Sequence, residues 1–211
     1  MILNSDALSQ RLKTRLQAPL PGLDIQMRMA PPLRSKEVSI PDNVKYSAIL
    51  LLLYPHEGRW HIPFMRRAED GRVHGGQISF PGGRIESVDQ TPTDTALREA
   101  EEELGIPRTE VEILGNLTEI YIPPSNFIVY PRVGLMRERP AFQLDPKEVA
   151  GVIEVHPASF LEQGNIGRHR VDVFGGNFIE APGYTVNGDQ LIWGGTAMMI
   201  AEFAHIWGEI R

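Results

Sequence analysis

Apolar residues in the middle of the chain occur in short runs that are separated by turn-forming residues. The runs at 47–54 and 60–66 are joined by Pro55-His56-Glu57-Gly58, and this pattern predicts a β-hairpin. The same kind of pattern predicts further strands at 77–80, 111–120, 127–136, 152–155, 171–174 and 184–193. Strands therefore outnumber helices, and the order of the elements indicates a mixed α+β fold.

Helices are expected near both ends of the chain. Leu8, Leu12 and Leu16 are four residues apart and follow Ser5, a suitable N-cap, so residues 5–17 are predicted to form an amphipathic helix. Prolines between 19 and 41 indicate an extended connector, and a last helix is expected at 196–207. We therefore divide the chain into an N-terminal helix with a proline-rich connector, residues 1–43, and a main domain, residues 44–211.

Composition and charge exclude several functional classes. The formal net charge of -6 gives no general attraction to nucleic acid or to an anionic membrane. The absence of cysteine excludes disulfides, a thiolate nucleophile and a cysteine-based zinc site. The longest apolar run, at 48–54, is far shorter than the roughly 20 residues of a membrane span, and no secretory signal is visible. A soluble, cytoplasmic protein is expected.

The best-defined element is a helix of roughly 13 residues between 91 and 106. Thr91 is its expected N-cap, Pro92 fits the first helical position, and Asp94 stands three residues after the cap. Gly105 fits the left-handed position at the C-terminal end. A glycine turn, Pro81-Gly82-Gly83, precedes the helix and would let backbone carbonyls approach a ligand.

Three carboxylates gather on one side of this helix. At about 100° per residue, Glu99, Glu102 and Glu103 fall within one wedge, whereas Glu101 points elsewhere. Arg98 stands four residues before Glu102 and can hold it by an ion pair. Clustered carboxylates without cysteine favour Mg²⁺ or Mn²⁺, which suits hydrolysis of a phosphoanhydride. The alternative is a solvent-exposed acidic face, used at most for protein interaction.

These residues resemble a known family. The segment Arg98-Glu99-Ala100-Glu101-Glu102-Glu103-Leu104-Gly105-Ile106 is similar to the core of the Nudix box. Asp89 stands where the general box has glutamate, and one extra residue separates it from Arg98. Both departures resemble the version found in coenzyme A pyrophosphatases of the Nudix superfamily. The resemblance implies a Nudix-type α/β/α sandwich with a mixed sheet, here carrying an N-terminal helical extension.

The preceding segment also resembles that subfamily. The match is nearly complete over His74-Gly75-Gly76-Gln77-Ile78-Ser79-Phe80-Pro81-Gly82-Gly83, whereas Ala68 and Gly71 replace the usual serine and leucine. The resemblance implies hydrolysis of coenzyme A or an acyl derivative to 4′-phosphopantetheine and adenosine 3′,5′-bisphosphate. Other possibilities are action on ADP-ribose or another nucleoside diphosphate derivative, and a Nudix module that senses a nucleotide without turning it over.

Roles for individual residues follow from the resemblance. Glu99 and Glu103 would be the principal ligands of Mg²⁺ or Mn²⁺, with Glu102 as a third ligand or water-orienting group and the carbonyl of Gly82 or Gly83 as a backbone ligand. For the general base, Glu102 is our first candidate and Glu148 the second. Basic and polar residues before the glycine turn could contact substrate, and these are Arg67, Arg72, His74 and Gln77. The expected partner is a small nucleotide, and the chain could form a homodimer.

Overall fold

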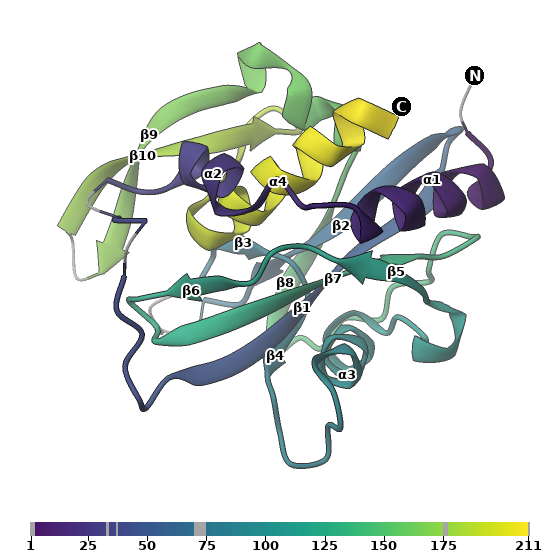
Figure 1. Cartoon of the computed structure of the whole chain (residues 1–211), viewed down its shortest axis with the longest axis horizontal. Helices are drawn as coiled ribbons and strands as arrows, with labels where there is room; N and C mark the ends of the chain where they lie inside the picture. The colour runs from purple at the N-terminus through teal and green to yellow at the C-terminus, as the bar shows by residue number, and fades with distance from the viewer. Residues whose placement is uncertain (1–2, 33, 37, 70–74, 175–176, 211) are drawn as a thin grey trace.

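A long antiparallel hairpin and a parallel neighbour form the centre of the fold (Figure 1). The computed structural model describes residues 3–32, 34–36, 38–69, 75–174 and 177–210. Strand β1 (Lys45–His56) pairs with β2 (Arg59–Arg67) on one side and with β7 (Phe127–Leu135) on the other. Between β1 and β2, Glu57 and Gly58 both have positive φ, of 48° and 70°. The predicted hairpin is thus confirmed, with a two-residue turn that suits the twist of its strands.

The described strands form two sheets. The larger sheet has eight strands in the order β3-β2-β1-β7-β5, with β4 beside β1, β6 beside β7 and β8 beside β2. Its remaining strands are β3 (Ile78–Ser79), β4 (Gly82–Arg84), β5 (Glu112–Asn116), β6 (Ile120–Ile122) and β8 (Val149–Val155). A smaller antiparallel sheet contains β9 (Ile166–Phe174), β10 (Asn177–Val186) and β11 (Gln190–Trp193).

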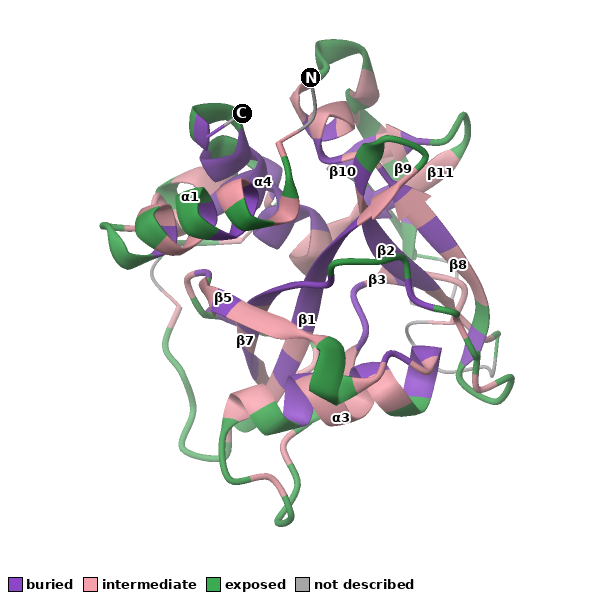
Figure 2. Cartoon of the chain, turned by 90° about the vertical axis from the view of Figure 1, so that its right-hand side faces the viewer, coloured by how far each residue is buried: buried purple, intermediate pink, exposed green. Residues whose placement is uncertain are grey.

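Helices cover both faces of the larger sheet (Figures 1 and 2). Helix α3 (Pro92–Leu104) packs on one face, where it joins the core cluster of Leu50 and Leu52. Helices α1 (Ser5–Gln17) and α4 (Gly194–Ile210) lie on the other face, in the core cluster of Leu51 and Leu53. Adjacent leucines of β1 thus face opposite layers, as the alternation of a strand requires. The expected α/β/α arrangement with a mixed sheet is confirmed.

The N-terminal segment differs in detail from the prediction. Helix α1 has the predicted bounds, but Asn4 rather than Ser5 is its N-cap, because the Asn4 side chain accepts a 2.8 Å hydrogen bond from the Ala7 amide. The predicted extended connector is wrong in part, since it contains α2 (Gly22–Gln26) and a 3₁₀ turn (Met27–Met29). Both pack against α4. Burial of an apolar face on α4 outweighs the local effect of the prolines.

Two predicted strands are divided. The segment predicted at 111–120 forms β5 and then leaves the sheet before β6, where the Thr118 amide and hydroxyl donate to the buried carboxylate of Glu202. The segment predicted at 184–193 contains a turn at Asn187 and Gly188, both with positive φ, so it forms the end of β10 and all of β11. Short 3₁₀ turns connect other elements, at Arg108–Glu110, Pro157–Leu161 and Gln163–Asn165. No helix in the described ranges is long and apolar enough to cross a membrane.

Candidate active site

Helix α3 forms as its sequence predicts. Thr91 accepts a hydrogen bond from the Asp94 amide, and the Asp94 side chain accepts one from the Thr91 amide, which completes a capping box. Gly105 ends the helix in the left-handed region, with φ of 69°. The 13 residues between these caps place the carboxylates of the last two turns beside β1 and β4.

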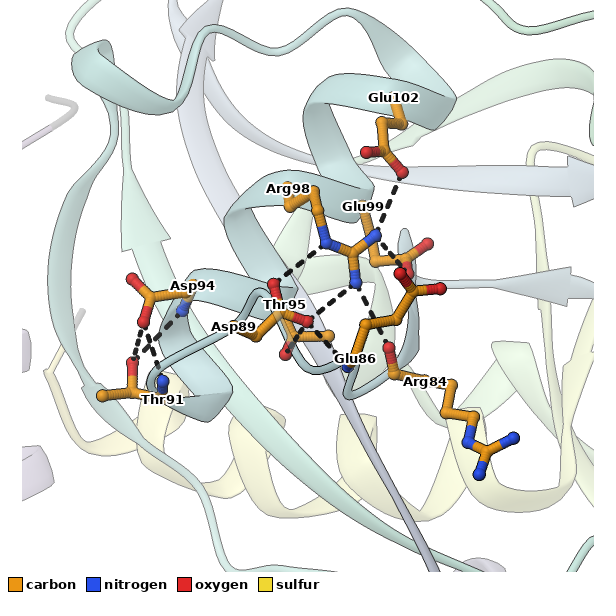
Figure 3. A network of polar contacts seen from close by, with 9 residues as sticks. All are labelled: Arg84, Glu86, Asp89, Thr91, Asp94, Thr95, Arg98, Glu99 and Glu102. Carbon is orange, nitrogen blue, oxygen red and sulfur yellow. Dashed lines mark hydrogen bonds and ion pairs between the residues drawn. The ribbon is translucent and has the colours of Figure 1, made fainter.

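Arg98 is the centre of a polar network beside α3 (Figure 3). Its guanidinium forms a two-pronged contact with Asp89, with N–O distances of 3.0 Å from Nε and 2.9 Å from Nη2. It also donates to Glu99 at 2.8 Å and to Glu102 at 3.0 Å, so the predicted i,i+4 ion pair is confirmed. Hydrogen bonding to Arg98 holds the pKa of Asp89 well below its ordinary value.

Asp89 was missed by the sequence reasoning, which noted it only as a departure from the general box. Its side chain is 3% exposed and also accepts a 2.9 Å hydrogen bond from the Thr95 hydroxyl. Asp89 therefore fixes Arg98 from the side opposite the carboxylates. The signal was present in the sequence, since Asp89 stands where the general Nudix box has glutamate, but its partner is defined only by the folded structure.

Glu103 lies in the interior, although the helix pattern grouped it with Glu102. Its side chain accepts a 2.8 Å hydrogen bond from the Gly82 amide, and the residue is only 3% exposed. Burial raises the pKa of Glu103 to about 8, and the charges of Glu99 and Glu148 act in the same direction. Arg67 acts in the opposite direction. Three carboxyl groups, of Glu99, Glu103 and Glu148, and the guanidinium of Arg67 therefore lie near one another here.

Glu99 fills the space beside the glycine turn. A β-carbon placed on Gly83 would stand 2.4 Å from the Glu99 carboxyl carbon, and one on Gly82 would stand 2.4 Å from the Ala48 carbonyl oxygen. Gly82, with φ of 152°, therefore needs glycine, whereas a side chain at Gly83 would displace the Glu99 carboxylate. Burial raises the pKa of Glu99, an effect that Arg98 opposes and that Glu102 and Glu148 reinforce. Glu99, Glu103 and Glu148 form what we call the carboxylate cluster.

Glu148 reaches this cluster from the start of β8. Its carbonyl accepts a 2.8 Å hydrogen bond from the Ala68 amide, and in the β2–β8 ladder Arg67 stands opposite Val149 after a register shift. Three residues before Glu148, the Asp145 amide donates a 3.1 Å hydrogen bond to the Glu103 carbonyl at the C-terminal end of α3. The strand pairing and this bond together bring Glu148 and Arg67 to that end of the helix. Glu102 also acts electrostatically on Glu99, but its side chain is 59% exposed.

The other predicted site residues are placed as follows. Gln77 lies beside Arg67, because the Arg67 amide donates to the Gln77 carbonyl at 3.0 Å. Arg72 and His74 lie outside the described residues. Glu101 points away from the cluster, as expected, and pairs with Arg108 at 2.5 Å.

The carboxylate oxygens of this site are the kind of ligand that a hard divalent cation prefers. No three carboxylate or imidazole side chains among the described residues lie close enough together to hold a metal ion. Arg98 lies between Glu99 and Glu102, and Glu103 is turned to the Gly82 amide. Buried Glu103 and partly buried Glu99 have raised pKa values, and a nearby cation would stabilise both carboxylates in their charged form.

Comparisons with known proteins agree with this geometry. A family model described as the NUDIX domain matches residues 45–171. A Nudix hydrolase named NudL and described as uncharacterized, from Yersinia pestis, is 38% identical over 141 residues, which cover 66% of this chain and 68% of the relative. The NudL of Yersinia pseudotuberculosis gives the same values.

Two solved structures share the fold at low sequence identity. A Nudix hydrolase from M. smegmatis, RenU, has a TM-score of 0.56 at 16% identity, covering 87% of this chain and 95% of its own. A MutT/nudix family protein from Enterococcus faecalis has a TM-score of 0.52 at 14% identity, covering 99% and 76%. The family match spans β1 to β9 and contains the carboxylate cluster. The chain belongs to the Nudix hydrolase family.

Proposed function

We propose that this hydrolase cleaves the pyrophosphate bond of coenzyme A or an acyl-CoA, giving 4′-phosphopantetheine and adenosine 3′,5′-bisphosphate. The observation that carries the proposal is the convergence of the carboxylate cluster and Arg67 at the glycine turn. The choice of coenzyme A is supported by the segment from His74 to Gly83, which resembles that subfamily of Nudix enzymes.

In this proposal Glu99, Glu103, Glu102 and the Gly83 carbonyl hold Mg²⁺ or Mn²⁺. When bound, such an ion neutralises charge on the phosphate oxygens and makes a bound water more acidic. Arg98 and Asp89 are positioning residues, because Arg98 donates to Glu99 and is itself held by Asp89. Gly82 keeps Glu103 directed toward the turn through its amide.

Glu148 is the better placed of the two candidate general bases. It acts electrostatically on both Glu99 and Glu103. Glu102 acts on Glu99 as well, but it is largely exposed and held by Arg98. A carboxylate beside the metal ligands can accept the proton of an attacking water. Arg67 lies on the same side and can pair with a phosphate oxygen, and Arg72, His74 and Gln77 remain further candidates for substrate contacts.

The direct test is to incubate the full chain with coenzyme A and Mg²⁺ or Mn²⁺ and to identify the products by mass spectrometry. We expect 4′-phosphopantetheine and adenosine 3′,5′-bisphosphate. If coenzyme A stays intact while ADP-ribose is cleaved, the proposed substrate is wrong, but the assignment as a Nudix pyrophosphatase holds. Nucleotide binding without turnover of any substrate in the panel would identify a sensing module instead.

Single variants test the assigned roles. Glu148→Gln is expected to lower kcat by about 100-fold or more, since general-base catalysis contributes about 10²–10⁴-fold. Glu102→Gln should lower kcat less and weaken metal dependence. The reverse order of effects would make Glu102 the base.

A further inference from the structure

An open pocket lies on the α3 side of the sheet, next to β4. Its volume is about 720 Å³, which is within the range of sites that take small-molecule ligands. The residues of its lining that matter here are Asn43, Lys45, Tyr46, Arg84, Pro92 and Tyr130. We call it the tyrosine pocket. The carboxylate cluster uses none of these side chains.

Two tyrosine rings form its most distinctive wall. Tyr46 on β1 and Tyr130 on β7 stack with ring centroids 6.2 Å apart and an interplanar angle of 18°. Both face the α3 layer, because Ala48, two residues after Tyr46, is the register partner of Tyr130 and packs against α3. Tyr46 remains 45% exposed. An exposed aromatic face at a pocket is a surface on which a flat heteroaromatic ring can stack.

The charge of the pocket suits an anionic ligand. Among the described residues its lining contains Arg84 and no acidic residue, although the chain as a whole carries a net charge of -6. Lys45 also belongs to the lining, but its ammonium group lies over the Phe127 ring, 5.4 Å from the ring centroid. Arg132 lies outside this lining, with its guanidinium carbon 5.8 Å from the centroid of the Tyr130 ring, and the charge of Glu119 acts on both groups. Arginine beside an aromatic surface is typical of sites for a nucleobase that carries phosphate.

Strand β4 connects the wall of the tyrosine pocket to the neighbourhood of the carboxylate cluster. Gly83, which contacts Glu99, pairs with Ala48 of β1, and Tyr46 lies two residues along that strand, about 7 Å away. Arg84 follows Gly83 directly, and its carbonyl accepts a 3.2 Å hydrogen bond from Arg98 (Figure 3). One network therefore fixes both Glu99 and the wall of the pocket.

We propose that the tyrosine pocket binds the nucleoside end of the substrate, with the base stacked on Tyr46 and Tyr130 and the sugar phosphate near Arg84. The inference rests on the proposed function, since it places one half of the same substrate. The pyrophosphate then extends along β4 toward Glu99. The other half of the substrate lies beyond the carboxylate cluster, away from the tyrosines.

The test compares the two halves of coenzyme A as separate ligands. Binding of adenosine 3′,5′-bisphosphate and of 4′-phosphopantetheine to the full chain is measured by calorimetry with Mg²⁺. In Tyr46→Ala/Tyr130→Ala we expect affinity for the adenosine ligand to fall by about tenfold or more, since base stacking is worth 1–3 kcal/mol per base. Affinity for 4′-phosphopantetheine should not change. Equal affinity for the adenosine ligand in both proteins, or an equal loss for both ligands, would overturn the proposal.

Controls separate stacking from unfolding. The single variant Tyr46→Ala removes a half-exposed ring and is expected to leave thermal melting close to that of the wild type. Phe178→Ala removes a 51% exposed ring from β10, outside the pocket, and should leave both affinities unchanged. Intact coenzyme A together with ring-dependent binding of the adenosine ligand would reject the proposed reaction and keep the pocket. Cleavage of coenzyme A by the wild type, together with unchanged binding of the adenosine ligand by the tyrosine variants, would support the proposed reaction and reject the role of the pocket.

Discussion

Replacing Gly83 by alanine tests whether the position of Glu99 controls catalysis. The added β-carbon would stand 2.4 Å from the Glu99 carboxyl carbon, about 1 Å closer than ordinary van der Waals contact. The carboxylate is the far end of a flexible side chain, so it can move aside. We therefore expect a loss of stability of about 1 kcal/mol, at the low end for overpacking.

The effect on activity should be much larger than the effect on stability. A displacement of about 1 Å at a group that positions the reacting atoms can lower the rate by about 100-fold. Steady-state hydrolysis of coenzyme A, or of whichever diphosphate substrate the panel identifies, gives kcat for Gly83→Ala and the wild type. Urea unfolding of the same samples gives the change in the free energy of unfolding.

Gly151 provides the matched control. It lies in β8, and a β-carbon built on it meets nothing within 4 Å. Gly151→Ala should therefore leave kcat within about twofold of the wild type, because nothing near the site moves. Full activity of Gly83→Ala would refute the role given to Glu99. Equal losses in the two variants would show that glycine substitution itself, and not the contact with Glu99, causes the defect.

Three further predictions concern stability and the assignment of the acids. Asp89→Asn should lower the free energy of unfolding by about 3 kcal/mol near pH 7, because it leaves part of the Arg98 guanidinium without its buried partner. The pKa of Asp89 is depressed in the folded protein, so its contribution is present above about pH 4 and is lost as the pH falls further; urea titrations should show the two proteins converging in acid. Leu12→Ala should cost about 3 kcal/mol in thermal or urea unfolding, since Leu12 is fully buried, whereas Gln10→Ala on the exposed side of α1 should change little. Glu101→Gln should keep the metal dependence and kcat of the wild type, and a large loss would show that Glu101 belongs to the site.

The burial of α1 bears on how the N-terminal segment should be treated in experiments. Leu8 and Leu12 belong to the same core cluster as residues of β1 and α4. Glu202 of α4 accepts hydrogen bonds from the Gly22 amide at 3.1 Å and from the Gln26 side chain at 2.8 Å. The boundary at residue 43 stays a prediction, and removal of residues 1–43 would expose this apolar surface. The full chain is therefore the right material for assays.

The sequence by itself determined the local features of this protein. The hairpin between β1 and β2, the caps of α3 and the ion pair between Arg98 and Glu102 were all predictable, because each depends on residues within a few positions of one another. Helical spacing also separated Glu101 from the other acids. The resemblance of residues 98–106 to the Nudix box led to the correct family.

Only the tertiary structure decided which acids share one environment. Glu102 and Glu103 are neighbours in the sequence, yet one is largely exposed and the other is buried against the Gly82 amide. Glu148 joins Glu99 only because β8 pairs with β2 and returns the chain to the end of α3. Burial and charge depend on groups that are distant in the sequence, and periodicity along one helix carries no information about them. The sequence could name the acids, but the pairing of β1, β2 and β8 determines how they act together.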